Sequence, residues 1–203
     1  YDGTSVLLKP DEVRRIIGYM PDSLPDYKDV MVWEYLDFFA RSFGLKGDER
    51  RRTLSDIEEF TSLGEMRYKY LASLSKGMKQ RVSLGRTLIH NPKVLIMDEP
   101  AAGLDPRARL ELRSLLKILS GQGKAILLSS HILSELQDIC DAAVIIEKGK
   151  ILSAGKINNM LAEGEKKRLK SEEVLQIKSL QQSEAVKLKL MENPLIGKIS
   201  VID

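Results

Sequence analysis

A short apolar segment that ends in two carboxylates constrains this chain more than any other part of its sequence. Residues 94–97 read Val-Leu-Ile-Met, and Asp98, Glu99 and Pro100 follow directly. An apolar segment of this length that stops at a turn signal is typical of a strand buried on both faces of a parallel sheet. Open α/β sheets bind their ligands at the carboxyl ends of such strands. The segment therefore predicts an α/β fold with an acidic site at the edge of a mostly parallel sheet.

The two carboxylates, Asp98 and Glu99, are predicted to have different tasks. Adjacent residues of a strand point to opposite faces, so one side chain can reach a metal ion while the other faces a reacting group. The alternative is a core strand that ends in a solvated acidic turn, with no chemistry attached. The motifs on either side of the strand favour the first interpretation.

Three further motifs lie around this strand. The segment 74–81 reads Leu-Ser-Lys-Gly-Met-Lys-Gln-Arg and precedes it, whereas Ala-Ala-Gly-Leu-Asp-Pro at 101–106 follows it. A second apolar segment, 125–130, ends at His131. The order resembles that of the ATP-binding-cassette (ABC) ATPases: signature motif, Walker B strand with a catalytic glutamate, D-loop and H-loop. The resemblance covers about residues 1–160, and these motifs in this order are far more specific than any one of them.

The resemblance implies a role for each polar residue in the strand-end motifs. Asp98 would hold Mg²⁺, Glu99 would orient and deprotonate the attacking water, and His131 would hydrogen-bond the γ-phosphate of ATP. For His131 the alternative is a structural histidine. Asp105 would lie across a dimer interface and connect two ATP sites. Its alternative is a plain helix start, because Asp is a good N-cap and Pro a good first helical residue, and both interpretations can hold together.

Ser75 and Gly77 are predicted to open a helix that Asn91 and Pro92 close. A serine at this position is ordinarily an N-cap. Free N–H groups, the positive end of the helix dipole and a hydroxyl can also bind an anion. The resemblance implies that this helix start grips the γ-phosphate of ATP held by a second subunit. Lys76 stands where the family has its first signature glycine, and it adds positive charge there.

Two features upstream also fit the family's order. A short apolar strand at 16–20 leads into Pro21 and Asp22, where the family's Q-loop normally has a glutamine. A carboxylate can still serve Mg²⁺, which prefers hard oxygen ligands. The alternative for Asp22 is a plain turn aspartate. Residues 28–90 are predicted to be mostly helical, and the resemblance implies that they form the helical subdomain that meets a membrane subunit.

Composition limits the functions open to the chain. The 203 residues carry a net charge of +3 from 32 basic and 29 acidic residues, which gives no case for nucleic acid as a partner. The single cysteine, Cys140, excludes an internal disulfide and suits a reducing cytosol. No apolar stretch has transmembrane length and no signal peptide is evident. A role at the membrane would therefore need a separate partner chain.

The C-terminal part differs in character from the rest. A hairpin is predicted at 144–153, and residues 163–173 are expected to form a charged linker or an exposed helix. A strand-helix-strand pattern at 174–202 resembles the start of an appendage found on some ABC proteins. We therefore expect a partial ABC ATPase domain at 1–160, and a linker with a partial C-terminal β-α-β appendage at 161–203.

Together with the resemblance, the sequence favours an interpretation as the ATP-binding and ATP-hydrolysing subunit of an ABC transporter. The resemblance implies a P-loop NTPase-like core, with ATP and Mg²⁺ as cofactors. Its expected partners are a membrane permease subunit, of the exporter type with a separate permease chain, and a second ATP-binding subunit in a homodimer. Such a subunit would be cytoplasmic, and peripheral on the inner face of the cell membrane. Two alternatives stay open: a soluble ABC ATPase acting in DNA repair or translation, and an inactive fragment without a phosphate-binding loop.

The glycine-rich phosphate loop, G-x-x-x-x-G-K-[ST], does not occur in the sequence. Lys124 follows Gly123, but Ile118 stands where the first glycine would be, and Ala125 replaces the hydroxyl residue. The family places this loop upstream of residues that resemble 2–3. We therefore expect an initial segment of the domain, the Walker A region, to be absent through truncation or an incomplete gene.

Without the backbone N–H cradle and its lysine, a chain loses its main grip on phosphate. We therefore predict that these 203 residues alone bind ATP weakly or not at all. Isothermal titration calorimetry of the chain with Mg²⁺ and ATP measures this directly, and a micromolar dissociation constant would contradict the prediction.

Overall fold

A computed structural model describes residues 9–25, 27–132, 139–157 and 159–160. The chain divides into two units at residues 158 and 159, and the account below concerns the first. The predicted β-α-β appendage and its linker, at 161–203, lie outside the described residues. The appendage and the domain boundary at 160 therefore stay predictions.

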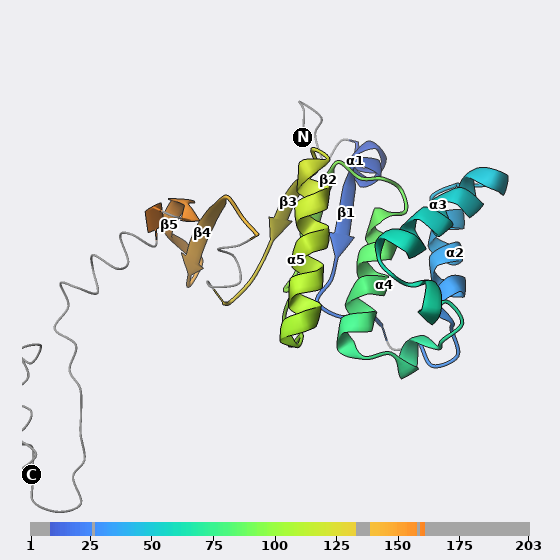
Figure 1. The fold of residues 1–203 in the computed structure, drawn as a ribbon. Helices are drawn as coiled ribbons and strands as arrows, with labels where there is room; N and C mark the ends of the chain where they lie inside the picture. The colour runs from blue at the N-terminus through green and yellow to red at the C-terminus, as the bar shows by residue number, and fades with distance from the viewer. Residues whose placement is uncertain (1–8, 26, 133–138, 158, 161–203) are drawn as a thin grey trace, which may run out of the picture. The chain divides into compact units, whose positions relative to one another are not determined.

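Three parallel strands form the sheet that positions the predicted site (Figure 1). They are β1 (Ile17–Met20), β2 (Val94–Met97) and β3 (Ala125–Leu128). β2 is the central strand, and in the register Met97 pairs with Met20 on one side and with Leu128 on the other. The predicted α/β fold with a parallel sheet is therefore confirmed, and the three strands end at one edge.

The two faces of this sheet differ in burial. Leu95 and Met97 are almost completely buried, against apolar side chains of the helices. Ile96 lies between them and is only partly buried, and its register partners Tyr19 and Leu127 are 53% and 65% exposed. The prediction that the central strand is buried on both faces is thus wrong for the described residues, because their helices leave the face of Ile96 partly open.

The helices in the described part of the chain are α1 (Pro10–Ile16), α2 (Val32–Ser42), α3 (Gly47–Phe60), α4 (Lys76–Leu88) and α5 (Pro106–Gly121). Two 3₁₀ turns, Gly64–Met66 and Leu71–Ser73, lie between α3 and α4. The block 28–90 is therefore mostly helical, as the spacing of its apolar residues predicts.

An antiparallel hairpin, β4 (Ala142–Glu147) and β5 (Lys150–Lys156), follows the parallel strands in the sequence. The two residues that join its strands, Lys148 and Gly149, have φ of 48° and 75°. Left-handed values at both turn positions match the twist of the flanking strands. The predicted hairpin at 144–153 is confirmed, with strands longer than expected.

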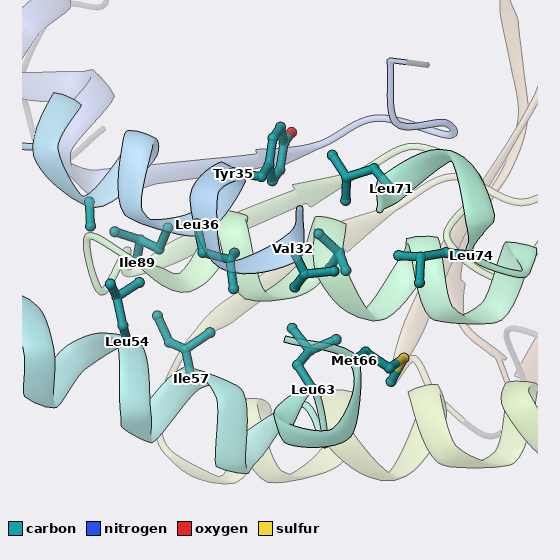
Figure 2. Close-up of a cluster of buried hydrophobic side chains, with 12 residues drawn as sticks. Val32, Tyr35, Leu36, Leu54, Ile57, Leu63, Met66, Leu71, Leu74 and Ile89 are labelled. Carbon is teal, nitrogen blue, oxygen red and sulfur yellow. The ribbon is translucent and has the colours of Figure 1, made fainter. Parts of the chain in front are cut away.

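Helix α4 belongs to two hydrophobic clusters. On one side Val82 packs in a cluster with α2 and α3, in which Leu36 points toward Ile57 (Figure 2). On the other side Leu84 packs in a cluster that contains Leu95 of β2 and apolar residues of α5. Val82 and Leu84 are both fully buried. Helix α4 therefore fixes the helical block against the sheet.

Two glycines let α4 and the chain just beyond it approach their neighbours closely. A Cβ on Gly18 of β1 would lie 2.8 Å from both Thr87 Cγ2 and Pro92 Cγ. A Cβ on Gly85 of α4 would lie 3.0 Å from Ile57 Cγ2 of α3. At Gly18 the contacts include the Thr87 backbone oxygen at 2.9 Å, so a side chain would force the backbone apart, whereas at Gly85 the Ile57 side chain would have to shift by a few tenths of an ångström.

Polar side chains at the C-terminal end of α4 also bind the backbone of β1. Arg86 donates to the carbonyl of Tyr19, and Thr87 Oγ1 lies 3.3 Å from the same oxygen and 2.8 Å from the Ser83 carbonyl of α4. Just beyond the helix, His90 Nε2 lies 3.0 Å from the carbonyl oxygen of Ile17. Because a carbonyl oxygen can only accept, this contact requires a proton on Nε2 of His90. These bonds hold α4 along the strand that leads to the predicted Q-loop.

Burial lowers the pKa of His90 below its usual value of 6.5; the bond to Ile17 opposes this shift, and the charges of Arg86 and Lys124 add to it. As the pH falls below about 6.5, the unfolded chain therefore binds a proton that the folded chain still excludes. We predict that the free energy of unfolding decreases as the pH is lowered through this value and that the His90 contribution levels off below the folded-state pKa. Denaturant titrations between about pH 8 and about pH 5.5 measure this.

The sequence offers a matched control, because His131 is its other histidine. His90→Gln keeps a donor for the Ile17 carbonyl but cannot titrate, so this part of the pH dependence should disappear. His131→Gln should retain it. If both variants and the unchanged chain gave the same pH dependence, His90 would not be its source.

Candidate functional site

The carboxyl edge of the sheet brings together the segments that follow its three strands. The Asp98 amide donates to the carbonyl of Met20 at 2.8 Å, and the Ser129 amide donates to the carbonyl of Met97 at 2.9 Å. These bonds continue the parallel ladder by one residue beyond the strands. The residues after β1, β2 and β3 therefore begin side by side, where open α/β sheets bind ligands.

Ser129 links the two acidic residues at this edge. Its hydroxyl donates to Asp98 Oδ1 at 2.7 Å and accepts from the Glu99 amide at 2.9 Å. A serine hydroxyl has one proton and two lone pairs, so it can make both bonds at once. Ser129 thereby fixes the Asp98 side chain and the Glu99 backbone, and it leaves the second Asp98 oxygen for another partner.

Glu99 has an uncommon backbone conformation. Its φ is 45°, in the left-handed region that few residues other than glycine adopt, because β2 ends at Met97 and the chain then turns. The prediction that Asp98 and Glu99 alternate as neighbours within one strand is therefore wrong in its geometry. Their side chains have different partners, Ser129 for Asp98 and His131 for Glu99, and their separate tasks stay a prediction.

His131 lies against Glu99 at the strand edge. Its Nδ1 is 3.0 Å from Glu99 Oε2, and the two side chains are 68% and 27% exposed, respectively. With a proton on Nδ1, the imidazole donates to the carboxylate. If the ring is also protonated on Nε2, that N–H can donate to an anion from the solvent side. The structure therefore brings the predicted pair Glu99 and His131 together.

Asp22 lies in the turn after β1 and is exposed. Its carboxylate accepts from the Ser23 hydroxyl at 3.1 Å, and its backbone carbonyl accepts from Gln80 Nε2 at 2.9 Å. Within the described residues, no group of three or more His, Cys, Asp or Glu side chains could hold a metal ion. Mg²⁺ is usually bound by one or two carboxylates, with water and substrate phosphates as its other ligands, so Asp98 and Asp22 stay its predicted ligands.

The predicted signature and D-loop residues lie at two neighbouring helix starts. Ser75 is the N-cap of α4, and its hydroxyl accepts from the Met78 amide at 3.3 Å. Asp105 is the N-cap of α5 and accepts from the Ala108 amide at 2.9 Å. A Cβ on Gly77 would lie 3.1 Å from Ala108 Cβ, so glycine permits this approach. The capping interpretations are confirmed, and the phosphate and interface roles stay predictions.

Lys76 brings the signature segment to the D-loop segment of the same chain. Gly103 has φ of 65°, and a Cβ there would lie 2.7 Å from Lys76 Nζ. Arg81 of α4 forms an ion pair with Glu111 of α5, which links the same two helices further along. The lysine that replaces the family's glycine therefore lies against the D-loop turn.

Two residues of this region, Ser129 and Gln80, were not singled out from the sequence. Ser129 follows β3 as Asp98 follows β2, so its place at a shared strand edge was a signal that could have found it. Gln80 binds a carbonyl 58 residues away, and no local pattern indicates such a contact.

Comparisons with known proteins identify the class that this fold and these motifs define. Residues 2–102 match the family model described as "ABC transporter". The ABC transporter ATP-binding protein sll0415 of Synechocystis is 34% identical over 156 residues, which are 76% of this chain and 44% of the relative. The Nod factor export ATP-binding protein I of Burkholderia thailandensis is 37% identical over 153 residues, 75% of this chain and 50% of the relative. A solved ATP-binding subunit of an ABC transporter superimposes with a TM-score of 0.68 at 30% identity, over 81% of this chain and 68% of that one.

The chain therefore belongs to the ATP-binding proteins of the ABC transporter family. It spans about half the length of the curated relatives that it matches. Across the described ranges, no helix combines the length and the apolar character needed to cross a membrane. The family resemblance predicted from the four motifs is confirmed.

Proposed function

We propose that this chain belongs to the ATP-hydrolysing subunit of an ABC transporter and drives transport through a separate membrane permease, with ATP and Mg²⁺ as cofactors. One observation carries the proposal: Ser129 ties Asp98 to Glu99, and Glu99 in turn contacts His131. To catalyse hydrolysis of a phosphoanhydride, a protein mainly has to position the reacting groups and compensate negative charge. This edge of the sheet supplies groups for both.

The carboxylates of Asp98 and Asp22 are assigned the role of Mg²⁺ ligands. Mg²⁺ bound with ATP would compensate the negative charge of the phosphates. Asp98 has one oxygen held by Ser129, so its other oxygen is free to contact the ion directly or through water. Asp22 is exposed in the turn after β1 and would contribute the second carboxylate, in place of the family's glutamine.

Glu99 is assigned the role of base for the attacking water, and His131 that of hydrogen-bond donor to the γ-phosphate. Glu99 would accept the proton that the attacking water loses as its oxygen bonds to phosphorus. Its backbone is fixed by Ser129, and its carboxylate is oriented by the 3.0 Å contact to His131. His131 would donate from Nε2 to the γ-phosphate while Nδ1 stays toward Glu99. A well-placed general base of this kind contributes about 10²- to 10⁴-fold to a rate.

The starts of α4 and α5 are assigned to the contact with a second subunit. Ser75 and Gly77 leave backbone N–H groups at a positive helix end, which favours a phosphate. Asp105 begins the adjacent helix, and Lys76 adds positive charge between the two. We propose that this surface meets the ATP held by another copy of the chain, so that the working form is a homodimer.

A permease partner places the proposed subunit at the cytoplasmic face of the cell membrane. The relative from Burkholderia thailandensis is named as an export protein, which supports an exporter with a separate permease chain. The relatives' names favour transport over the alternative of a soluble ABC ATPase in DNA repair or translation. The helical block formed by α2, α3 and α4 would be the part that meets the permease.

Replacement of the proposed base tests the catalytic assignment. In the full-length protein, Glu99→Gln should lower ATP hydrolysis by about 10²- to 10⁴-fold, because an amide cannot accept the proton of the attacking water. ATP binding should be retained, since the Asp98 side chain and its bond to Ser129 are unchanged. Phosphate release and equilibrium nucleotide binding measure the two effects separately.

Glu65→Gln is the matched control, because Glu65 is exposed in a 3₁₀ turn of the helical block. It makes the same chemical change away from the strand edge and should hydrolyse ATP at the rate of the unchanged protein. Turnover by Glu99→Gln close to that of Glu65→Gln would remove Glu99 from the role of base.

A further inference from the structure

The hydrogen bond between Gln80 and Asp22 connects the signature helix to the turn after β1. Gln80 lies on α4, in the turn of helix that follows the N-cap Ser75. Its side-chain Nε2 donates to the backbone carbonyl of Asp22 at 2.9 Å. Gln80 is only 4% exposed, and a buried amide is rarely retained without a partner. The contact therefore defines the position of both groups.

The surroundings of this bond combine one apolar contact with an open cavity. A cavity of about 270 Å³ is lined by Ser23 and Leu24 of the turn and by Lys76 and Lys79 of α4, among others. Leu24 packs against the hydrophobic cluster that contains Val82, whereas Asp22 and Ser23 are exposed, so packing anchors the turn only at Leu24. The hydrogen bond from Gln80 anchors it at Asp22.

The two partners also differ in how firmly the fold holds them. Gln80 projects from α4, which is fixed by Val82 in one hydrophobic cluster and by Leu84 in the other. Asp22 and Ser23 lie outside helices and strands and are exposed. The helix is therefore the rigid partner, and the bond transfers its position to the turn.

We propose that Gln80 is a positioning residue that holds the Asp22 turn against α4 and so sets where the Asp22 carboxylate stands at the carboxyl edge of the sheet. The inference rests on the proposed function, because it gives Gln80 a task through a carboxylate assigned to Mg²⁺. It also joins the Ser75 helix start and the Asp22 turn into one unit, so that a shift of α4 changes the cation side of the site.

Gln80→Met tests the proposal, because methionine has a similar length and no donor. Gln80→Glu is a second variant that keeps the shape but places an oxygen against the Asp22 carbonyl. Thr87→Val is the control: Thr87 is buried on the same helix, and its hydroxyl lies 2.8 Å from the Ser83 carbonyl oxygen of α4 and 3.3 Å from the Tyr19 carbonyl oxygen of β1. Neither of these acceptors lies in the Asp22 turn.

Backbone ¹⁵N relaxation of the full-length protein without nucleotide measures the holding role directly. In both Gln80 variants, the order parameters of Asp22 and Ser23 should fall from about 0.85 to below about 0.6. In Thr87→Val they should match the unchanged chain. Equal order parameters in all of these proteins, or an equal loss in Thr87→Val, would overturn the proposal.

The dependence of ATP hydrolysis on Mg²⁺ concentration tests the consequence for the site in the full-length protein. Gln80→Met should raise the half-saturating Mg²⁺ concentration by about tenfold or more, as the loss of a group that orients a metal ligand does. Thr87→Val should leave it unchanged. No hydrolysis by the unchanged protein would refute the proposed function alone, whereas hydrolysis with the same Mg²⁺ dependence in Gln80→Met and Thr87→Val would refute the role of Gln80.

Discussion

The parallel pairing of β2 with both of its neighbours is the interaction on which the rest of this structure depends. Because the three strands end in register, the segments after them begin at one edge, and two backbone bonds extend the pairing to Asp98 and Ser129. Only in that register can one serine hydroxyl reach both the Asp98 carboxylate and the Glu99 amide. The chemistry proposed for the edge therefore follows from strand register more than from any single side chain.

Helix α4 extends this arrangement from the sheet to the helical block. Its two buried sides place it in both hydrophobic clusters, and Gly85 lets α3 approach it closely. Its start carries Ser75, its next turn binds the Asp22 carbonyl, and its end binds the backbone of β1. A helix held at so many points makes the acidic edge and the signature segment parts of one mechanical unit.

Sequence reasoning succeeded where the signals were local and failed where they depended on tertiary contacts. An apolar run before two carboxylates marked β2, and Asp105 before a proline marked a helix start, because strand and cap preferences act over a few residues. The same run could not show that the face of Ile96 is partly open, since periodicity does not tell what covers a strand. The left-handed φ of Glu99 and the contact of Gln80 with a distant carbonyl arise only when the chain is folded.

The central claim is that a divalent cation bound with ATP sits at the edge formed by β1, β2 and β3. Mn²⁺ can replace Mg²⁺ at oxygen-rich sites and broadens the NMR signals of nearby nuclei. In the full-length protein with ATP, the account predicts that substoichiometric Mn²⁺ broadens the amide signals of Asp98, Glu99 and Ser129 before those of α3. Broadening around exposed acidic residues of α3, such as Asp48, with sharp signals at the strand edge, would contradict it.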